Sequence, residues 1–136
     1  MTKLIEMSMH SNGIYEIIFH ATNRAAVDEY MATLEEILVQ KIENEETVRV
    51  MIDMTQVNTL PPIAYVTEKG RQIVRDHFAD RDKVHIRSAF IADRAMQITL
   101  SIAQSLMNLL PIDATIEVFA PEERQQAEDW LNDNTE

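Results

Sequence analysis

Apolar and polar residues alternate between Lys3 and Met9, which is typical of a half-buried β-strand. A second run rich in apolar and aromatic residues, Ile14–Phe19, predicts another strand. Residues 10–13 read HSNG, a sequence of turn-forming residues. We therefore expect the chain to begin with an antiparallel hairpin.

After Asn23 the spacing of apolar residues changes from two to three and four, which predicts a helix that ends in the acidic run at residues 43–46. Thr22 or Asn23 is suited to accept the first free backbone N–H groups as the helix cap. The apolar face of this predicted helix comprises Val27, Tyr30, Met31, Leu34, Ile37, Leu38 and Ile42.

The rest of the chain alternates between predicted strands and helices. We expect strands over residues 47–54, 84–92 and 115–119, and helices over residues 62–80, from 93 to just before Pro111, and from Pro121 onward. Strands joined through helices imply parallel pairing with right-handed crossovers. The order ββαβαβαβα thus predicts a single α/β domain over residues 1–136, with helices packed on a mixed, largely parallel five-stranded sheet.

The composition removes several kinds of chemistry from this α/β fold. The chain has only two glycines, Gly13 and Gly70, so the glycine-rich loops that bind dinucleotides or nucleotide phosphates cannot be formed. It has no cysteine, which excludes disulfides, thiolate catalysis and cysteine-ligated metals. The four histidines lie singly, and no serine sits in a nucleophile elbow. We expect no catalytic residues, no metal site and no cofactor.

The net charge of −11 argues against binding to nucleic acid or to an anionic membrane. More than half of the basic residues nevertheless lie between Lys69 and Arg94, which predicts either a mildly basic surface or a solvated face with internal ion pairs. No segment has the pattern of a signal peptide or of a membrane span. We therefore expect a cytoplasmic protein that does not insert into membranes.

Two stretches of sequence carry a resemblance to a known family. Residues 51–60, MIDMTQVNTL, look like a strand that ends in an Asp-Leu-Ser-x-Val-like turn, and residues 119–123 and 127–131, FAPEE and AEDWL, look like a closing helix. With the element order, they resemble the STAS family of sulfate-transporter and anti-sigma-factor-antagonist domains. The closing helix is similar to that of a bacterial branch bordering on the CRAL-TRIO lipid-binding fold. The resemblance implies a regulatory domain that binds proteins.

One departure from the family concerns its regulatory switch. In anti-sigma-factor antagonists the turn continues into an Asp-Ser pair whose serine is phosphorylated by a partner kinase, but Pro61 and Pro62 stand there in this sequence. Proline has no hydroxyl, so this switch cannot operate at that position. Thr55 and Thr59 lie nearby as alternative phosphate acceptors, or they use their hydroxyls to form turns and caps.

The loop that follows the third predicted strand is the candidate binding site. In open α/β sheets, ligands bind beyond the carboxyl ends of parallel strands, and this loop leaves such an end. The alternative is that its polar residues merely close the backbone into turns. The candidate residues are Asp53, Thr55, Asn58, Thr59, Pro61 and Pro62.

The third predicted helix has more apolar residues than packing on one sheet face requires. A second apolar stripe lies beside its core-facing stripe. This surplus indicates either deep burial or a surface that pairs with a second copy or covers an apolar ligand. The residues of this candidate dimer or ligand surface are Ile98, Ile102, Leu106 and Leu109.

Three classes of function follow from these observations. The first is a non-catalytic interaction and regulatory domain, a homodimer that meets an unidentified protein partner through the loop after the third strand and the second and third predicted helices. The second is a carrier of a small apolar, lipid-like ligand, which requires a cavity of roughly 300 Å³ or more lined by Met and Leu. The third is an enzyme, which requires a polar pocket with converging titratable side chains.

Overall fold

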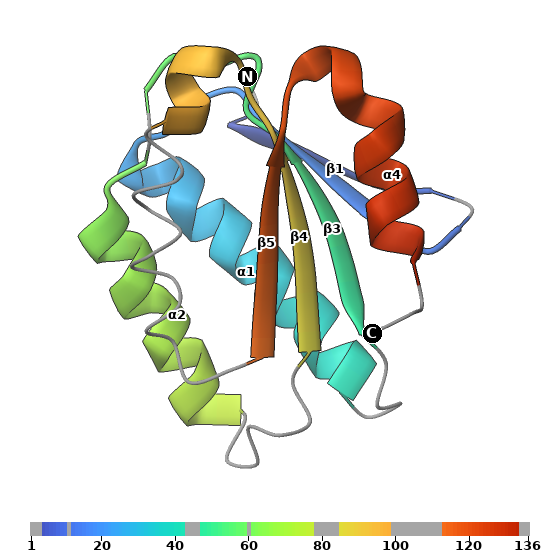
Figure 1. Ribbon diagram of the computed structural model, residues 1–136. Helices are drawn as coiled ribbons and strands as arrows, with labels where there is room; N and C mark the ends of the chain where they lie inside the picture. The colour runs from blue at the N-terminus through green and yellow to red at the C-terminus, as the bar shows by residue number, and fades with distance from the viewer. Residues whose placement is uncertain are drawn as a thin grey trace.

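The computed structural model of the chain describes residues 4–10, 12–42, 47–59, 61–77, 85–98 and 113–133 (Figure 1). Its strands confirm all five predicted from the sequence, with ends that differ by one or two residues. Of the third predicted helix, only residues 94–98 are described, and they are helical. The elements are β1 (Ile5–Met9), β2 (Tyr15–Phe19), α1 (Arg24–Ile42), β3 (Val48–Asp53), α2 (Ile63–His77), β4 (His85–Ile91), β5 (Asp113–Phe119), a 3₁₀ turn (Pro121–Glu123) and α4 (Arg124–Asn132).

The strands form one sheet in the order β1-β2-β3-β4-β5. β1 pairs with β2 antiparallel, while every later neighbouring pair is parallel. This confirms the predicted hairpin and the mixed, largely parallel five-stranded sheet. Because each right-handed crossover moves one strand further in the same direction, the crossover helices α1 and α2 lie on the same face of the sheet (Figure 1). α4 follows the last strand and covers the opposite face.

The larger hydrophobic core lies between the sheet and helices α1 and α2. Alternate residues of β3, Val48, Val50 and Ile52, point into it and are buried. From α1, the predicted apolar face contributes Val27, Met31, Ile37 and Leu38, with Tyr30 and Leu34 partly buried at its margin. Burial raises the pKa of Tyr30 to about 12. The helical spacing in the sequence therefore identified the core side of α1 correctly.

The smaller core lies between the sheet and α4. Only Ala127 and Leu131 of α4 are buried there. They pack on the sheet residues that point the other way from the main core: Ile14, Met51, Ala89 and Ile91. The rings of Phe119 and Trp130 lie 6.1 Å apart at its margin. Because this apolar contact is small, polar contacts at the two ends of α4 matter for its attachment.

Local caps follow the residues that the sequence places at helix starts and turns. The Asn23 side chain accepts a hydrogen bond from the Ala26 N–H at 2.9 Å, and Asp93 accepts one from the Met96 N–H at 2.9 Å. In the hairpin turn, Gly13 has a φ of 87°, a conformation that favours glycine. These contacts confirm the predicted positions of the turn and of the two helix starts.

Candidate functional site

The loop after β3 begins at a buried carboxylate. Asp53, the last residue of β3, is only 8% exposed. Its Oδ1 accepts a hydrogen bond from the Thr55 N–H at 2.8 Å and another from the Thr55 hydroxyl at 2.5 Å. Both donors come from the residue two positions on, so Asp53 closes the start of the loop into a turn. The contacts of Asp53 and Thr55 are therefore those of turn-forming residues, the alternative to a binding role that the sequence left open.

Most of the other candidate residues of the loop face solvent. Asn58, Thr59 and Pro62 are exposed, and Pro61 is half-buried. The Thr59 hydroxyl lies 2.9 Å from the hydroxyl of Thr22, which ties the loop to the segment just before α1. Of the candidate residues, only Asp53 is buried, and its hydrogen bonds tie the exposed Thr55 to the base of the loop. We call residues 53–62 the binding loop.

A cluster of charged side chains holds the base of this loop to α4. Arg124, in the first turn of α4, donates one guanidinium N–H to Asp53 Oδ2 at 3.2 Å and another to Glu16 Oε2. Glu16 lies on β2 and is also 8% exposed. Burial disfavours the charged guanidinium, but the hydrogen bonds and negative charges of Glu16 and Asp53 outweigh this effect and raise the pKa of Arg124. A single cation thus compensates two buried carboxylates.

His10 extends this cluster toward the hairpin. Its Nε2 lies 2.7 Å from Glu16 Oε1, and its Nδ1 lies 3.4 Å from Glu128 Oε1 on α4. We call His10, Glu16, Asp53, Arg124 and Glu128 the ionic cluster. Among the residues that the structure describes, no group of His, Asp or Glu side chains is arranged to hold a metal ion. The cluster joins β2, β3, the hairpin turn and α4 at one place.

Sequence reasoning identified Asp53 but missed the other members of the ionic cluster. Arg124 and Glu16 are 108 positions apart, and neither belongs to a motif with a fixed spacing. One signal was present, because Glu16 is the only charged residue in the strand YEIIF. A charge within a strand that is otherwise apolar requires a partner when the strand is buried. The sequence does not identify that partner.

A second arginine fastens the other end of α4. Arg87 on β4 donates to the backbone carbonyls of Trp130 and Asp133 at the end of α4, both at 2.8 Å. Its guanidinium carbon also lies 4.4 Å from the centroid of the Trp130 ring. A cation at a helix C-terminus interacts favourably with the helix dipole. Arg124 and Arg87 therefore hold opposite ends of α4 on the sheet.

We expect Arg87→Gln to lower the free energy of unfolding by about 1–2 kcal/mol, because charge-assisted bonds to two carbonyls and the stacking on Trp130 are lost. Urea unfolding measures this change, with Arg71→Gln on the exposed side of α2 as the matched control. Trp130 is the only tryptophan, so its emission reports directly on this end of α4. An unchanged unfolding midpoint and unchanged emission would contradict this role of Arg87.

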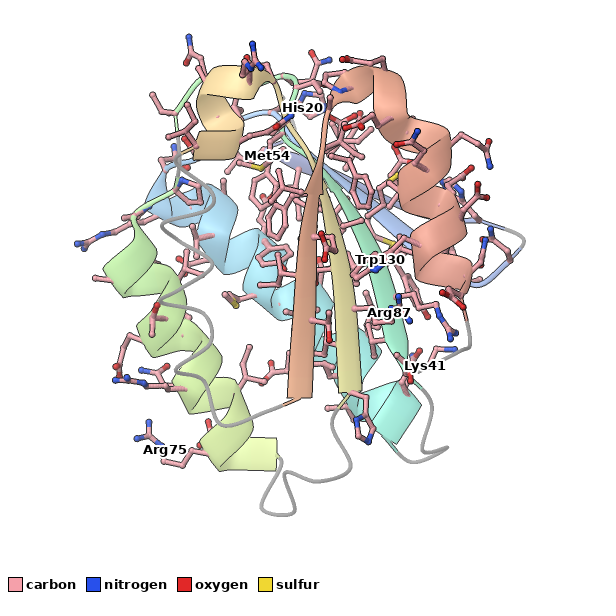
Figure 2. The ribbon with its side chains drawn as sticks, viewed as in Figure 1. His20, Lys41, Met54, Arg75, Arg87 and Trp130 are labelled. Atoms are coloured by element: carbon pink, nitrogen blue, oxygen red, sulfur yellow. The ribbon has the colours of Figure 1, made fainter. Side chains whose placement is uncertain are left out.

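Among the basic residues between Lys69 and Arg94 that the structure describes, Arg87 lies apart from those on α2 (Figure 2). Figure 2 shows Arg75 on α2 and Arg87 beside Trp130, on opposite sides of the sheet. Lys69 lies 5.5 Å from the ring centroid of Tyr65 and 3.9 Å from Asp28 Oδ1. The Tyr65 hydroxyl also donates a hydrogen bond to Asp28, and this bond raises the pKa of Tyr65. Lys69 is thus paired with an acidic residue, which fits the alternative of a solvated face with internal ion pairs, and strand alternation turns Arg87 away from α2.

The predicted dimer or ligand surface falls mostly outside the described residues. Ile98 is described and is 67% exposed. Ile102, Leu106 and Leu109 lie outside the described residues, so that surface stays a prediction.

One open hollow lies between α1 and α2. It has a volume of about 230 Å³, with Met31 and Ile73 among its lining and the carboxylates of Asp28, Glu35 and Asp76 around it. Its size and acidic lining differ from the apolar cavity of roughly 300 Å³ or more that a lipid carrier requires. This hollow therefore does not support the lipid-carrier interpretation.

The fold and the element order define an α/β domain of the STAS type. A family model described as SpoIIAA-like matches residues 17–132, which is most of the chain. The chain therefore belongs to the SpoIIAA-like family, which confirms the resemblance found in the sequence. Domains of this type are generally non-catalytic and typically interact with proteins. No curated protein and no solved structure matches the chain.

The described helices can be compared with the expectation that the chain does not insert into membranes. Within the described ranges, no helix is both long enough and apolar enough to span a bilayer.

Proposed function

We propose that this chain is a non-catalytic regulatory domain that binds a protein partner through the binding loop, residues 53–62. The observation that carries this proposal is the division of the loop into an anchored base and an exposed end. Asp53 holds the base through Thr55 and Arg124, while Asn58, Thr59 and Pro62 face solvent. An exposed segment on a rigid base loses little conformational freedom when it binds, which favours recognition.

Membership of the SpoIIAA-like family supports a protein as the partner rather than a small molecule. The loop leaves the carboxyl end of a parallel strand, a position at which open α/β sheets bind their ligands. The two prolines add a further reason. Their ring-fixed backbone reduces the entropy that the loop would otherwise lose when it is ordered by a partner.

The proposed interaction is not switched by phosphorylation at residues 61 and 62. Neither proline has a hydroxyl to accept a phosphate. The Thr55 hydroxyl already donates to the buried Asp53 carboxylate, and a phosphate there would place about two negative charges beside it. We therefore propose that neither Thr55 nor residues 61 and 62 switch the loop by phosphorylation, which leaves the exposed Thr59 as its candidate phosphate acceptor.

The exposed end of the loop provides the test of this proposal. We expect the double variant Asn58→Ala, Pro62→Ala to reduce partner affinity at least about tenfold, which corresponds to about 1.4 kcal/mol. Immobilised wild-type and variant proteins are compared for capture from lysate of the cells that make the protein. The specifically retained protein is identified by mass spectrometry, and its dissociation constant is then measured with purified components.

Gln126→Ala is the matched control, because Gln126 is equally exposed but lies on α4. It should bind like the wild type. Thermal unfolding of all three proteins shows whether the loop variant remains folded. Equal affinity of a folded loop variant and the wild type would exclude the binding loop as the site.

A further inference from the structure

The outer edge of β1 is an unpaired strand edge with exposed apolar side chains. β1 is the first strand of the sheet and pairs only with β2 within the described residues. Met7 is 47% exposed and Met9 is 63% exposed, whereas Ile5 on the same strand face is buried. Unpaired strand edges with apolar side chains readily pair with another strand.

The backbone hydrogen bonds of the hairpin show which β1 residues face outward. The His20 N–H donates to the Leu4 carbonyl at 2.9 Å, and the His10 N–H donates to the Ile14 carbonyl at 2.8 Å. In an antiparallel ladder, alternate residues exchange hydrogen bonds with one neighbour. The even-numbered residues of β1 therefore bond to β2. The N–H and C=O groups of Ile5, Met7 and Met9 point to the free edge.

β1 lacks the features by which edge strands usually avoid pairing. It contains no proline and no lysine, and its register with β2 runs without a bulge from Ile5 to Met9. The opposite edge strand, β5, carries the exposed charged residue Glu117. On β1 the only charge is Glu6, whose carboxylate lies 3.4 Å from His20 Nε2 on the side of β2.

We propose that a second copy of this chain pairs with β1 edge to edge, antiparallel and centred on Met7. This register places Met7 opposite Met7 of the second copy and Ile5 opposite Met9, so every outward-facing backbone group from Ile5 to Met9 is paired. It also places Glu6 opposite Ser8, which avoids a like-charge pair. The contact is isologous, as a two-fold dimer requires.

The neighbouring registers fit less well. Centring on Glu6 places the two Glu6 carboxylates opposite one another, which is destabilising. Centring on Ser8 leaves Ile5 opposite residue 11, beyond the end of the strand. Of these three registers, only the one centred on Met7 places every residue of β1 opposite a β1 residue of the second copy. This dimer is independent of the proposed function, because the binding loop takes no part in it.

Cysteine substitutions test both the contact and its register, because the natural chain has no cysteine. Facing residues of a hydrogen-bonded pair have Cα atoms about 5.5 Å apart, within the range of about 4.4–6.8 Å that a disulfide bridges. Under mild oxidation we expect Met7→Cys to form a covalent dimer at least about ten times faster than Glu117→Cys, the control on β5. Glu6→Cys alone should not exceed that control, whereas Glu6→Cys mixed with Ser8→Cys should form the mixed dimer.

Light scattering gives a second measurement without any cross-link. The wild type should be dimeric at tens of micromolar, and Met7→Lys should shift it to monomer, raising the dissociation constant at least about tenfold with an unchanged circular dichroism spectrum. A monomeric wild type, or equal cross-linking of Met7→Cys and Glu117→Cys, would overturn the proposal. Rapid cross-linking of Glu6→Cys alone would overturn the register centred on Met7.

Discussion

Replacing Arg124 with leucine is expected to lower the free energy of unfolding by about 3 kcal/mol. The guanidinium is the cation hydrogen-bonded to the buried carboxylates of Glu16 and Asp53. Removing one partner of a buried ion pair leaves an uncompensated buried charge, which typically costs about 3–5 kcal/mol. We expect the lower end of this energy range because the Arg124 side chain is 40% exposed. Water can therefore solvate part of the negative charge that the guanidinium leaves behind.

Urea unfolding of Arg124→Leu checks this value, with Gln126→Leu on the exposed side of α4 as the control. Adding Glu16→Gln and Asp53→Asn should recover part of the loss, because neutral side chains no longer need a cation. A loss below about 0.5 kcal/mol would mean that Arg124 makes only a surface ion pair.

The Leu131→Ala variant is expected to lose about 3 kcal/mol of unfolding free energy. The Leu131 side chain is fully buried and, with Ala127, is one of the two buried residues of α4. Large-to-small substitutions of buried leucine typically cost about 2–5 kcal/mol, since both apolar burial and packing are lost. The neighbouring core is small, with Ile14, Met51, Ala89 and Ile91 as the buried residues that face α4, so few side chains can move to fill the cavity.

Denaturant unfolding followed by Trp130 emission measures the effect of this change at α4 itself. Gln126→Ala, an alanine substitution on the exposed face of the same helix, should stay within about 0.5 kcal/mol of the wild type. If Leu131→Ala were as stable as the wild type, α4 would not be part of the cooperative fold, and the smaller core would need a different description.

Asp53 connects the proposed binding loop with α4. Its Oδ1 holds Thr55 in the loop, and its Oδ2 accepts from Arg124 on α4. The same carboxylate therefore accepts the hydrogen bonds that close the turn at Thr55 and forms the ion pair with Arg124. Loop and helix are therefore positioned by a common group at the carboxyl end of β3.

Local sequence patterns predicted the secondary structure well for physical reasons that act over a few residues. Side chains two apart share a strand face, and side chains three or four apart share a helix face, so burial is visible as periodicity. Gly13 and the cap residue Asn23 act on backbone groups next to them in the chain. The same locality identified Asp53 at the end of a strand.

Contacts between distant residues were not predictable in this way. The pairing of Arg124 with Glu16 depends on which strands are neighbours and on the face that α4 covers. Arg87 was grouped with the basic residues of α2 from its place in the chain, whereas alternation along β4 turns it toward Trp130. The spacing of residues within one element contains no information about either contact.

By itself the sequence determined the element order, the absence of glycine-loop and cysteine chemistry, and the absence of a hydroxyl at Pro61 and Pro62. Only the tertiary structure decided that Glu16, Asp53 and Arg124 meet at α4, and that Met7 and Met9 lie on a strand that pairs on one side only within the described part of the chain. The physical reason is that propensity and periodicity act within one element. Charge pairing and edge exposure depend on strand order, register and the face that each helix covers.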